Sequence, residues 1–236
     1  MPSRDIAEPA RSGGVEIVAD AVLFDNDGVL VDSHAQTELA WRRLAAEFDL
    51  DVETLLVELV GVRAADTLGR YLDGDRLTAA VDRLEDLEVE LAPLTEAGGG
   101  AADLLARLPD DRWTVVTSAT RRLAVARWRG AALPLSPTAV SAEDVSRGKP
   151  DPEPFLVGAE RLGADPSRCV VFEDSPSGGR AALAAGATVV AVGDQPWPIE
   201  PAVRIVDLSA VRVVELSPVT VAERAEGPVA LRCVPA

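Results

Sequence analysis

The segment FDNDGVLVDS (residues 24–33) follows the apolar run AVL (21–23) and places three carboxylates, Asp25, Asp27 and Asp32, within eight positions. Residues two apart on a strand point to the same side, so the side chains of Asp25 and Asp27 can converge if the extended geometry persists. Carboxylates this close raise one another's pKa. A hard divalent cation such as Mg²⁺, bound by oxygen ligands, would resolve this repulsion. The alternative is turn chemistry, since Asp-Gly is a common turn pair and Asp a common helix cap.

The rest of the chain predicts a parallel sheet that is interrupted once by helices. From residue 34 to about 92, apolar residues recur every three or four positions, which is typical of helices. After residue 100, Val- and Ile-rich segments alternate with helical ones, the pattern of a parallel sheet covered on both faces. The expected strands are 20–25, 113–118, 138–142, 169–174, 188–192 and an edge strand at 202–208.

These patterns predict an α/β fold, a Rossmann-like, doubly wound parallel sheet core with an inserted α-helical cap. The predicted units are an N-terminal lead-in (1–19), a core (20–33 and 93–236) and a helical cap (34–92). In such sheets ligands bind outside the carboxyl ends of the strands. The role of the C-terminal segment 216–236 is not readable from its sequence.

Composition narrows the classes of partner and compartment. Of the 236 residues 47% are hydrophobic and 26% charged, and the formal net charge is −16, which disfavours nucleic acid and anionic membranes as partners. The beginning of the chain has no apolar region typical of a signal peptide, and no apolar stretch is long enough to span a bilayer. The two cysteines, Cys169 and Cys233, suggest a reducing compartment, with one bridge left open. We expect a cytoplasmic protein and take a monomer as the default.

Two further strand ends carry polar residues. Glu173 and Asp174 follow the apolar run CVVF, and together with the first strand end they supply three or four oxygens for one metal. Alone, this pair could equally cap the next helix. Thr117, Ser118 and Ala119 end another strand, where hydroxyls and backbone N–H groups at a helix start could cradle a phosphate. Alone, this signal is weak, because Ser and Thr caps are common.

Lys149 is the one lysine among 23 basic residues. A lysine is a compact point charge, which a guanidinium is not. Two prolines fix its loop after the strand expected at 138–142. A single lysine is most often a solvated surface charge, but this placement favours a site residue. Carboxylates, a metal, hydroxyls and one cation together fit phosphoryl transfer through an aspartyl-phosphate.

The motifs DNDGVLVDS, TSAT, GKPDPEPF and VFEDSPSG, in this order, resemble the four motifs of the haloacid dehalogenase superfamily. They look most like its sugar-phosphatase and β-phosphoglucomutase-like branch with a helical cap. The resemblance implies that Asp25 is the nucleophile and Asp27 the general acid and base, which also ligates Mg²⁺ through its backbone carbonyl. It further implies that Ser118 binds the phosphoryl group and Lys149 stabilises it. Metal ligation by Asp174, and by Glu173 directly or through water, completes the implied site.

Two positions depart from the family pattern. Asn26 stands where an apolar residue is usual, and we expect its side chain to point away from the face that Asp25 and Asp27 share. Val60 replaces a cap histidine that is often seen in the sugar phosphatases. Arg63, three residues later, is a candidate substrate contact.

The resemblance favours an Mg²⁺-dependent phosphatase acting on phosphate monoesters of small sugars or polyols. A β-phosphoglucomutase-like phosphotransferase is the first alternative. Those enzymes carry a cap histidine twelve residues after the nucleophile, whereas Thr37 stands there and His34 lies one turn earlier. A non-catalytic binding protein on the same scaffold is the second alternative. We also predict that PLTEAGGG (93–100) and residues near 32–36 are the hinges of a moving cap.

Overall fold

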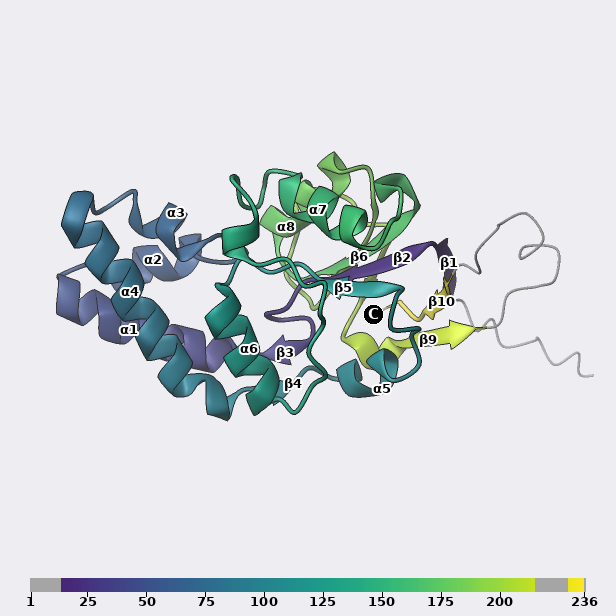
Figure 1. Cartoon of the computed structure of the whole chain (residues 1–236), viewed down its shortest axis with the longest axis horizontal. Coiled ribbons are helices and arrows are strands. Elements are labelled where there is room, and N and C mark those ends of the chain that lie inside the picture. Colours follow the sequence, from purple (N-terminus) through teal and green to yellow (C-terminus); the bar gives the residue numbers. More distant parts are fainter. Residues whose placement is uncertain (1–13, 215–228, 236) are drawn as a thin grey trace, which may run out of the picture.

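The computed structural model describes residues 14–214 and 229–235, and its centre is a five-stranded parallel sheet (Figure 1). The strand order is β5-β2-β6-β7-β8. These strands are β2 (Ala21–Phe24), β5 (Trp113–Val115), β6 (Cys169–Glu173), β7 (Thr188–Val192) and β8 (Val203–Ile205). The predicted fold class is confirmed, and the edge strand expected within 202–208 is β8.

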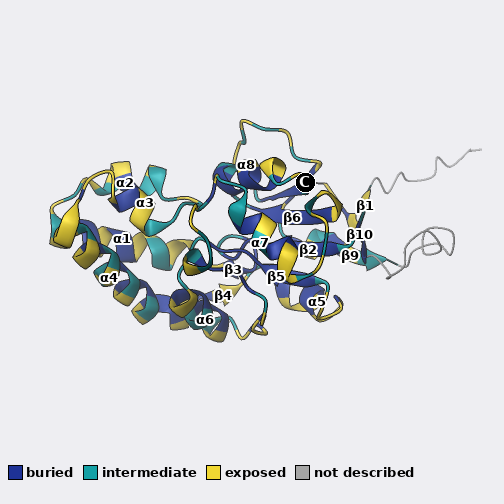
Figure 2. Cartoon of the chain, turned by 45° about the horizontal axis from the view of Figure 1, so that its top comes forward, coloured by how far each residue is buried: buried dark blue, intermediate teal, exposed yellow. Residues whose placement is uncertain are grey.

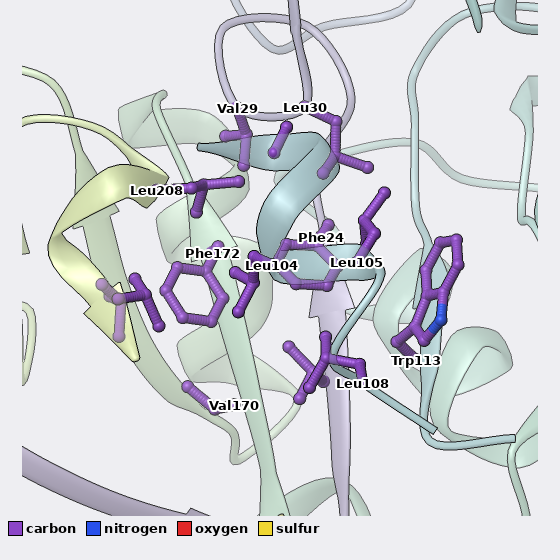
Figure 3. Close-up of a cluster of buried hydrophobic side chains, with 14 of the residues drawn as sticks. Phe24, Val29, Leu30, Leu104, Leu105, Leu108, Trp113, Val170, Phe172 and Leu208 are labelled. Atoms are coloured by element: carbon purple, nitrogen blue, oxygen red, sulfur yellow. The ribbon is translucent and has the colours of Figure 1, made fainter. Parts of the chain in front are cut away.

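Alternate residues of β2 face opposite sides of the sheet. Val22 and Phe24 belong to one hydrophobic cluster, whereas Ala21 and Leu23 belong to another. The first cluster lies under helix α5 (Ala101–Leu105), and Figure 3 shows Phe24 beside Phe172 within it. Their ring centroids are 5.2 Å apart. Full burial of one such side chain contributes about 1.5–3 kcal/mol to folding, so this face anchors the strand that carries the Asp25 site.

Two helices cover the opposite face of the sheet, α7 (Glu153–Arg161) and α8 (Pro176–Ala184). Phe155 of α7 and Ala181 of α8 share the second cluster with Leu23. Helix α8 begins directly after β6, where the Ser175 side chain accepts a hydrogen bond from the Gly178 N–H group. This cap fixes the turn that follows Glu173 and Asp174.

A second, antiparallel sheet lies at the end of the molecule away from the helical bundle (Figure 1). Its order is β1-β10-β9, with β1 (Val15–Ala19), β9 (Val211–Val214) and β10 (Val229–Cys233). The lead-in predicted over residues 1–19 is therefore wrong for its last five residues, because Ile17 and Ala19 are buried and β1 pairs along its length with β10. Part of the segment 216–236 forms β10; residues 215–228 and 236 lie outside the described part of the chain.

The strand expected at 138–142 is reduced to one bridge between Val140 and Val116. Val140 still belongs to the sheet edge, since its N–H group donates to the Val115 carbonyl and its carbonyl accepts from Thr117 N–H. The chain then enters a 3₁₀ turn at Ala142, which a capping box at Ser141 starts. The segment is too short to continue the ladder, but it leads directly to the loop of Lys149.

Four helices between β3 and β4 form a bundle with its own core, which we call the helical cap. They are α1 (His34–Phe48), α2 (Val52–Glu58), α3 (Ala64–Leu68) and α4 (Gly74–Leu91). The two long helices, α1 and α4, each carry buried residues along one side and exposed residues along the other (Figure 2). The third hydrophobic cluster, which includes Trp41, Leu44 and Leu84, is drawn entirely from this bundle. That 34–92 constitutes a separate domain stays a prediction.

The two connections to the helical cap pair with each other. β3 (Val31–Asp32) runs antiparallel to β4 (Glu96–Ala97), so the two predicted hinge segments lie side by side. Helix α6 (Arg121–Gly130) lies between the sheet and the bundle (Figure 1). The short 3₁₀ helices are Ala92–Leu94, Ala142–Asp144, Pro166–Arg168 and Leu208–Ala210. None of the helices in the described ranges combines the length and apolar character needed to cross a membrane.

Candidate active site

Asp25 stands immediately after β2 at the carboxyl edge of the sheet. Its N–H group donates to the Phe172 carbonyl of β6 at 2.8 Å, so the backbone is still held by the ladder at this residue. The residue is only 5% exposed. Lys149 Nζ lies 2.6 Å from its Oδ1 atom.

Lys149 is buried between two carboxylates rather than solvated. Its Nζ atom also donates to Glu173 Oε1 at 2.6 Å, and the residue is 2% exposed. Burial opposes the charge, yet the carboxylates of Asp25 and Glu173 hold the pKa of Lys149 above its ordinary value. The ammonium group is therefore a fixed positive charge beside Asp25.

Glu173 orients this lysine from the end of β6. Its Oε2 atom accepts hydrogen bonds from the Ser175 N–H and hydroxyl groups at 2.8 and 2.9 Å. A side chain at position 178 would collide with it, because a Cβ atom on Gly178 would lie 1.5 Å from Oε1. Both carboxylate oxygens thus have partners within the protein, and the carboxylate can turn very little.

Asp174 brings a third carboxylate to the same place. One oxygen each from Asp25, Glu173 and Asp174 lie within 4.8 Å of one another. The turn after β2 makes this approach possible. Gly28 has φ of +83°, and a Cβ atom there would lie 2.1 Å from Asp174 Oδ2. The glycine of the DNDG segment is therefore needed both for its backbone conformation and for space.

The charges of this cluster fit a divalent cation. Burial and the neighbouring carboxylates raise the pKa of Asp25 well above its ordinary value, although Lys149 opposes this rise. Burial likewise raises the pKa of Asp174, with His34 acting in the opposite direction. Three oxygen donors in close reach, with one lysine to balance them, are the donor set of a hard cation.

Asp27 lines the same cavity as Asp25, but it lies beyond the extended strand from which its convergence with Asp25 was expected. The extended chain ends before it, since the Asn26 carbonyl accepts from Leu30 and Val31 N–H in a tight turn. Instead, the Asp27 carboxylate accepts a hydrogen bond from Ser33 Oγ at 2.6 Å and lies 2.8 Å from Arg127 Nη1.

Asn26 also differs from the expectation. Its side chain is buried, and its Oδ1 atom accepts a hydrogen bond from Trp128 Nε1 at 2.6 Å. The amide nitrogen does not turn away from the site, since it donates to Asp27 Oδ2 at 3.2 Å. A polar residue at this position therefore connects helix α6 to Asp27.

The predicted phosphate-binding segment follows β5 and faces the same edge. The Ala119 N–H group is not free, because it donates to Thr117 Oγ1 at 3.0 Å. The Ser118 hydroxyl group donates to the Gly61 carbonyl of the helical cap at 3.1 Å. Ser118 is thus the member of the three whose hydroxyl group faces the junction of core and cap.

A cavity of about 580 Å³ opens between the strand ends and the helical cap. Its wall includes Asp25, Asp27, Asp174 and Ser118 from the core. The cap contributes both polar and apolar residues to the wall, and its large apolar side chains there include Trp41, Leu56, Leu59, Val60 and Val81. This cavity is large enough for a small organic phosphate.

Arg63 lines the cavity at the edge of the cap. Its guanidinium pairs with Asp66 at 2.7 Å and donates weakly to the carbonyl groups of Val145 and Ser146, at 3.5 and 3.4 Å. These contacts reach the loop that carries Lys149. Its contact with substrate stays a prediction.

Sequence reasoning missed Arg127 and Glu88. Arg127 in α6 is 4% exposed and joins Asp27 to Glu88 of α4, whose carboxylate it contacts at 3.0 Å. Burial raises the pKa of Glu88 to about 7, although Arg127 acts against the rise. Both residues are charged yet stand at positions where the helical pattern of the sequence expects an apolar residue. This was the signal by which the sequence could have identified them.

Residues 19–186 match the sequence model of the family described as haloacid dehalogenase-like hydrolase. The chain belongs to this hydrolase family. The family predicted from the four motifs is therefore confirmed. Hexitol phosphatase A of Escherichia coli (strain K12) is 40% identical over 175 residues, which cover 72% of this chain and 81% of that protein.

Glycerol-1-phosphate phosphohydrolase 2 of Saccharomyces cerevisiae is 30% identical over 190 residues, covering 75% of this chain and 76% of that protein. Among solved structures, β-phosphoglucomutase from Clostridium difficile is similar with a TM-score of 0.67 and 22% identity. That match covers 75% of this chain and 85% of the mutase. At this identity the likeness shows the fold alone.

Proposed function

We propose that this chain is a Mg²⁺-dependent phosphatase that hydrolyses phosphate monoesters of small sugars or polyols through an aspartyl-phosphate. The observation that carries the proposal is the buried contact between Lys149 Nζ and Asp25 Oδ1 at 2.6 Å, next to the carboxylate of Asp174. The ammonium group lies against the Asp25 carboxyl group and adds positive charge where a phosphoryl group would lie.

Transfer would begin when an Asp25 carboxylate oxygen attacks phosphorus. The bond between phosphorus and the ester oxygen breaks, and the protonated Asp27 carboxyl group gives its proton to the departing alcohol. Asp27, now ionised, then takes a proton from water, whose oxygen attacks phosphorus. The bond from phosphorus to Asp25 breaks, which releases inorganic phosphate and restores both carboxyl groups.

Oxygens of Asp25 and Asp174, with the Asp27 backbone carbonyl, would hold Mg²⁺. Glu173 would bind the cation directly or through a water molecule. When bound, the cation supplies neutralisation of charge on the phosphoryl oxygens. Lys149 keeps the nucleophile oriented, and the Ser118 hydroxyl would exchange the Gly61 carbonyl for a phosphoryl oxygen. Arg63 would border the remainder of the substrate.

The wall of the cavity supports a polyhydroxylated substrate with one phosphate. Glu38, Glu85 and Glu143 line it and can accept hydrogen bonds from hydroxyl groups. Among the described residues that line the cavity, the basic ones are His34, Arg63 and Arg127. Each faces a carboxylate, at 3.6, 2.7 and 2.8 Å respectively. The names of the two relatives, a hexitol phosphatase and a glycerol-1-phosphate phosphohydrolase, agree with such a substrate.

The same charge pattern argues against a mutase. A mutase must rebind a bisphosphate, which needs cations available for a second phosphate. Here the basic residues that line the cavity already face carboxylates, and Thr37 accepts a hydrogen bond from Arg127 at 2.9 Å. Incubation with β-glucose 1-phosphate and a bisphosphate primer should release inorganic phosphate, whereas formation of glucose 6-phosphate would identify the mutase.

The direct experiment is a phosphatase screen across glycerol, pentitol, hexitol and hexose phosphates, with and without Mg²⁺. We expect Mg²⁺-dependent phosphate release from a subset of these monoesters and none from Asp25→Asn. No release from any of these compounds or from p-nitrophenyl phosphate would favour a binding protein on this scaffold. Phosphate release by Asp25→Asn at the rate of the wild type would contradict the assignment of Asp25 as the nucleophile.

A further inference from the structure

Arg127 is a buried cation that belongs to the core but contacts the helical cap. It lies in the last turns of α6, where it is 4% exposed and lines the cavity. Its Nη1 atom lies 2.8 Å from Asp27 Oδ1. Its Nη2 atom donates to Glu88 Oε1 of α4 at 3.0 Å and to Thr37 Oγ1 of α1 at 2.9 Å.

We propose that Arg127 is a positioning residue that holds the Asp27 carboxyl group in the orientation that protonates the leaving alcohol, and links this orientation to the docked helical cap. The inference rests on the proposed function, because it assigns a role toward the acid of that reaction. It adds a residue that none of the four motifs contains.

The Asp27 carboxyl group is held through both of its oxygens. Ser33 and Arg127 contact Oδ1, and Asn26 donates to Oδ2. The amide of Asn26 is itself fixed by Trp128, the residue after Arg127. Two consecutive residues of α6 therefore determine where this carboxyl group points. An acid must be held in a narrow range of geometry for efficient proton transfer.

The Nη2 atom of the Arg127 guanidinium group contacts the helical cap. Glu88 and Thr37 belong to different cap helices, α4 and α1, yet both contact the same Nη2 atom. A planar guanidinium can contact both sides at once, which an ammonium group cannot do as well. Movement of the cap away from α6 would remove two of its partners and free the group that fixes Asp27.

The test compares two leaving groups. An alcohol needs a proton when it departs from glycerol 1-phosphate, whereas p-nitrophenolate departs without one. The value of kcat/KM reports the steps from substrate binding to departure of the leaving group from phosphorus. We expect Arg127→Met to lower kcat/KM for glycerol 1-phosphate at least about tenfold more than for p-nitrophenyl phosphate. Equal losses for the two substrates, or no loss for either, would overturn the proposal.

Arg122 offers a matched control on the same helix. It also pairs with α4, through Glu85 at 3.0 Å and Asp86 at 2.8 Å, and within the described part of the chain it forms no ion pair with Asp27. Arg122→Met should therefore leave the ratio of the two kcat/KM values unchanged. If it changes the ratio as much as Arg127→Met does, docking of the cap alone is responsible and the proposal is wrong.

Two more variants keep the test decisive. Arg127→Lys retains the charge, and we expect it to restore part of the lost ratio. No recovery in a folded Arg127→Lys protein would argue against a contact with Asp27.

If Arg127→Met does not fold, the double variant Arg127→Met/Glu88→Gln is used in its place, because it removes the cation together with one buried carboxylate. If Asp25→Asn is inactive but Arg127→Met leaves the ratio of the two kcat/KM values unchanged, this inference is rejected and the proposed function stands.

Discussion

Lys149 Nζ and Asp25 Oδ1 form a buried contact of 2.6 Å, although 124 positions separate the two residues along the chain. The contact exists because Asp25 directly follows the central strand β2 and Lys149 follows the segment that joins the sheet edge through Val140. Glu173, from the strand next to β2, holds the lysine from its other side.

Replacement of Lys149 by Met should lower kcat/KM by about 10²–10³-fold, because a preorganised positive charge is lost beside the transferring group. Phosphate release from a polyol phosphate at saturating Mg²⁺ measures this. Lys149→Arg should not restore activity, since the residue is 2% exposed and leaves no room for a guanidinium group. Arg147→Met, whose side chain is 72% exposed in the same loop, is the control and should retain activity. Full activity of Lys149→Met would contradict the assignment.

Substitution of Gly28 by Ala should both destabilise the protein and impair its catalysis. Its φ of +83° costs a side chain about 1–3 kcal/mol, and the new methyl group would meet Asp174 Oδ2. Gly193→Ala is matched, because its φ is +84° and no atom lies within 4 Å of the added carbon. Both variants should lose stability in urea unfolding, but only Gly28→Ala should also lose Mg²⁺-dependent activity. Equal activity in the two variants would show that the contact with Asp174 is unimportant.

Ionisation of Glu88 should make stability depend on pH. The unfolded chain loses this proton near pH 4.5, whereas the folded protein keeps it until about pH 7. Between these values the folded state binds more protons, so the free energy of unfolding falls as pH rises, by up to about 1.4 kcal/mol per unit. Arg127 opposes this effect, while Asp27 and Glu85 strengthen it.

Urea unfolding of the wild type and of Glu88→Gln at several pH values measures this contribution. The variant should gain stability relative to the wild type as pH rises through the window from 4.5 to about 7. Below the window the wild type should have its greatest advantage. A difference that does not change with pH would mean that Glu88 is ionised throughout and that Arg127 compensates its burial fully.

The sequence allowed the sheet and the neighbourhood of Asp25 to be predicted because strand ends are local features. Apolar runs followed by acids marked β2 and β6, and parallel strands bring such ends to one edge. The structure brings Asp25, Lys149, Glu173 and Asp174 together. Their catalytic roles stay proposals.

Other features depend on packing that no local pattern encodes. Periodicity places Arg127 and Glu88 on the buried sides of their helices, but it could not predict that they meet, because that depends on where α6 and α4 approach each other. β10 could not be recognised from its own segment, since its partner Val15–Ala19 lies at the other end of the chain. The turn at Asn26 ends the strand alternation before Asp27, so strand geometry alone could not fix the position of that side chain.

The central claim is that Asp25 carries the phosphoryl group, and rapid mixing of Asp27→Asn with p-nitrophenyl phosphate tests it most directly. This substrate needs no acid, whereas breakdown of the intermediate needs the base that the variant lacks. We predict a burst of nitrophenolate equal to the concentration of active sites, with phosphate found on Asp25 by peptide mass spectrometry. Turnover without a burst, or phosphate on a different residue, would contradict the account.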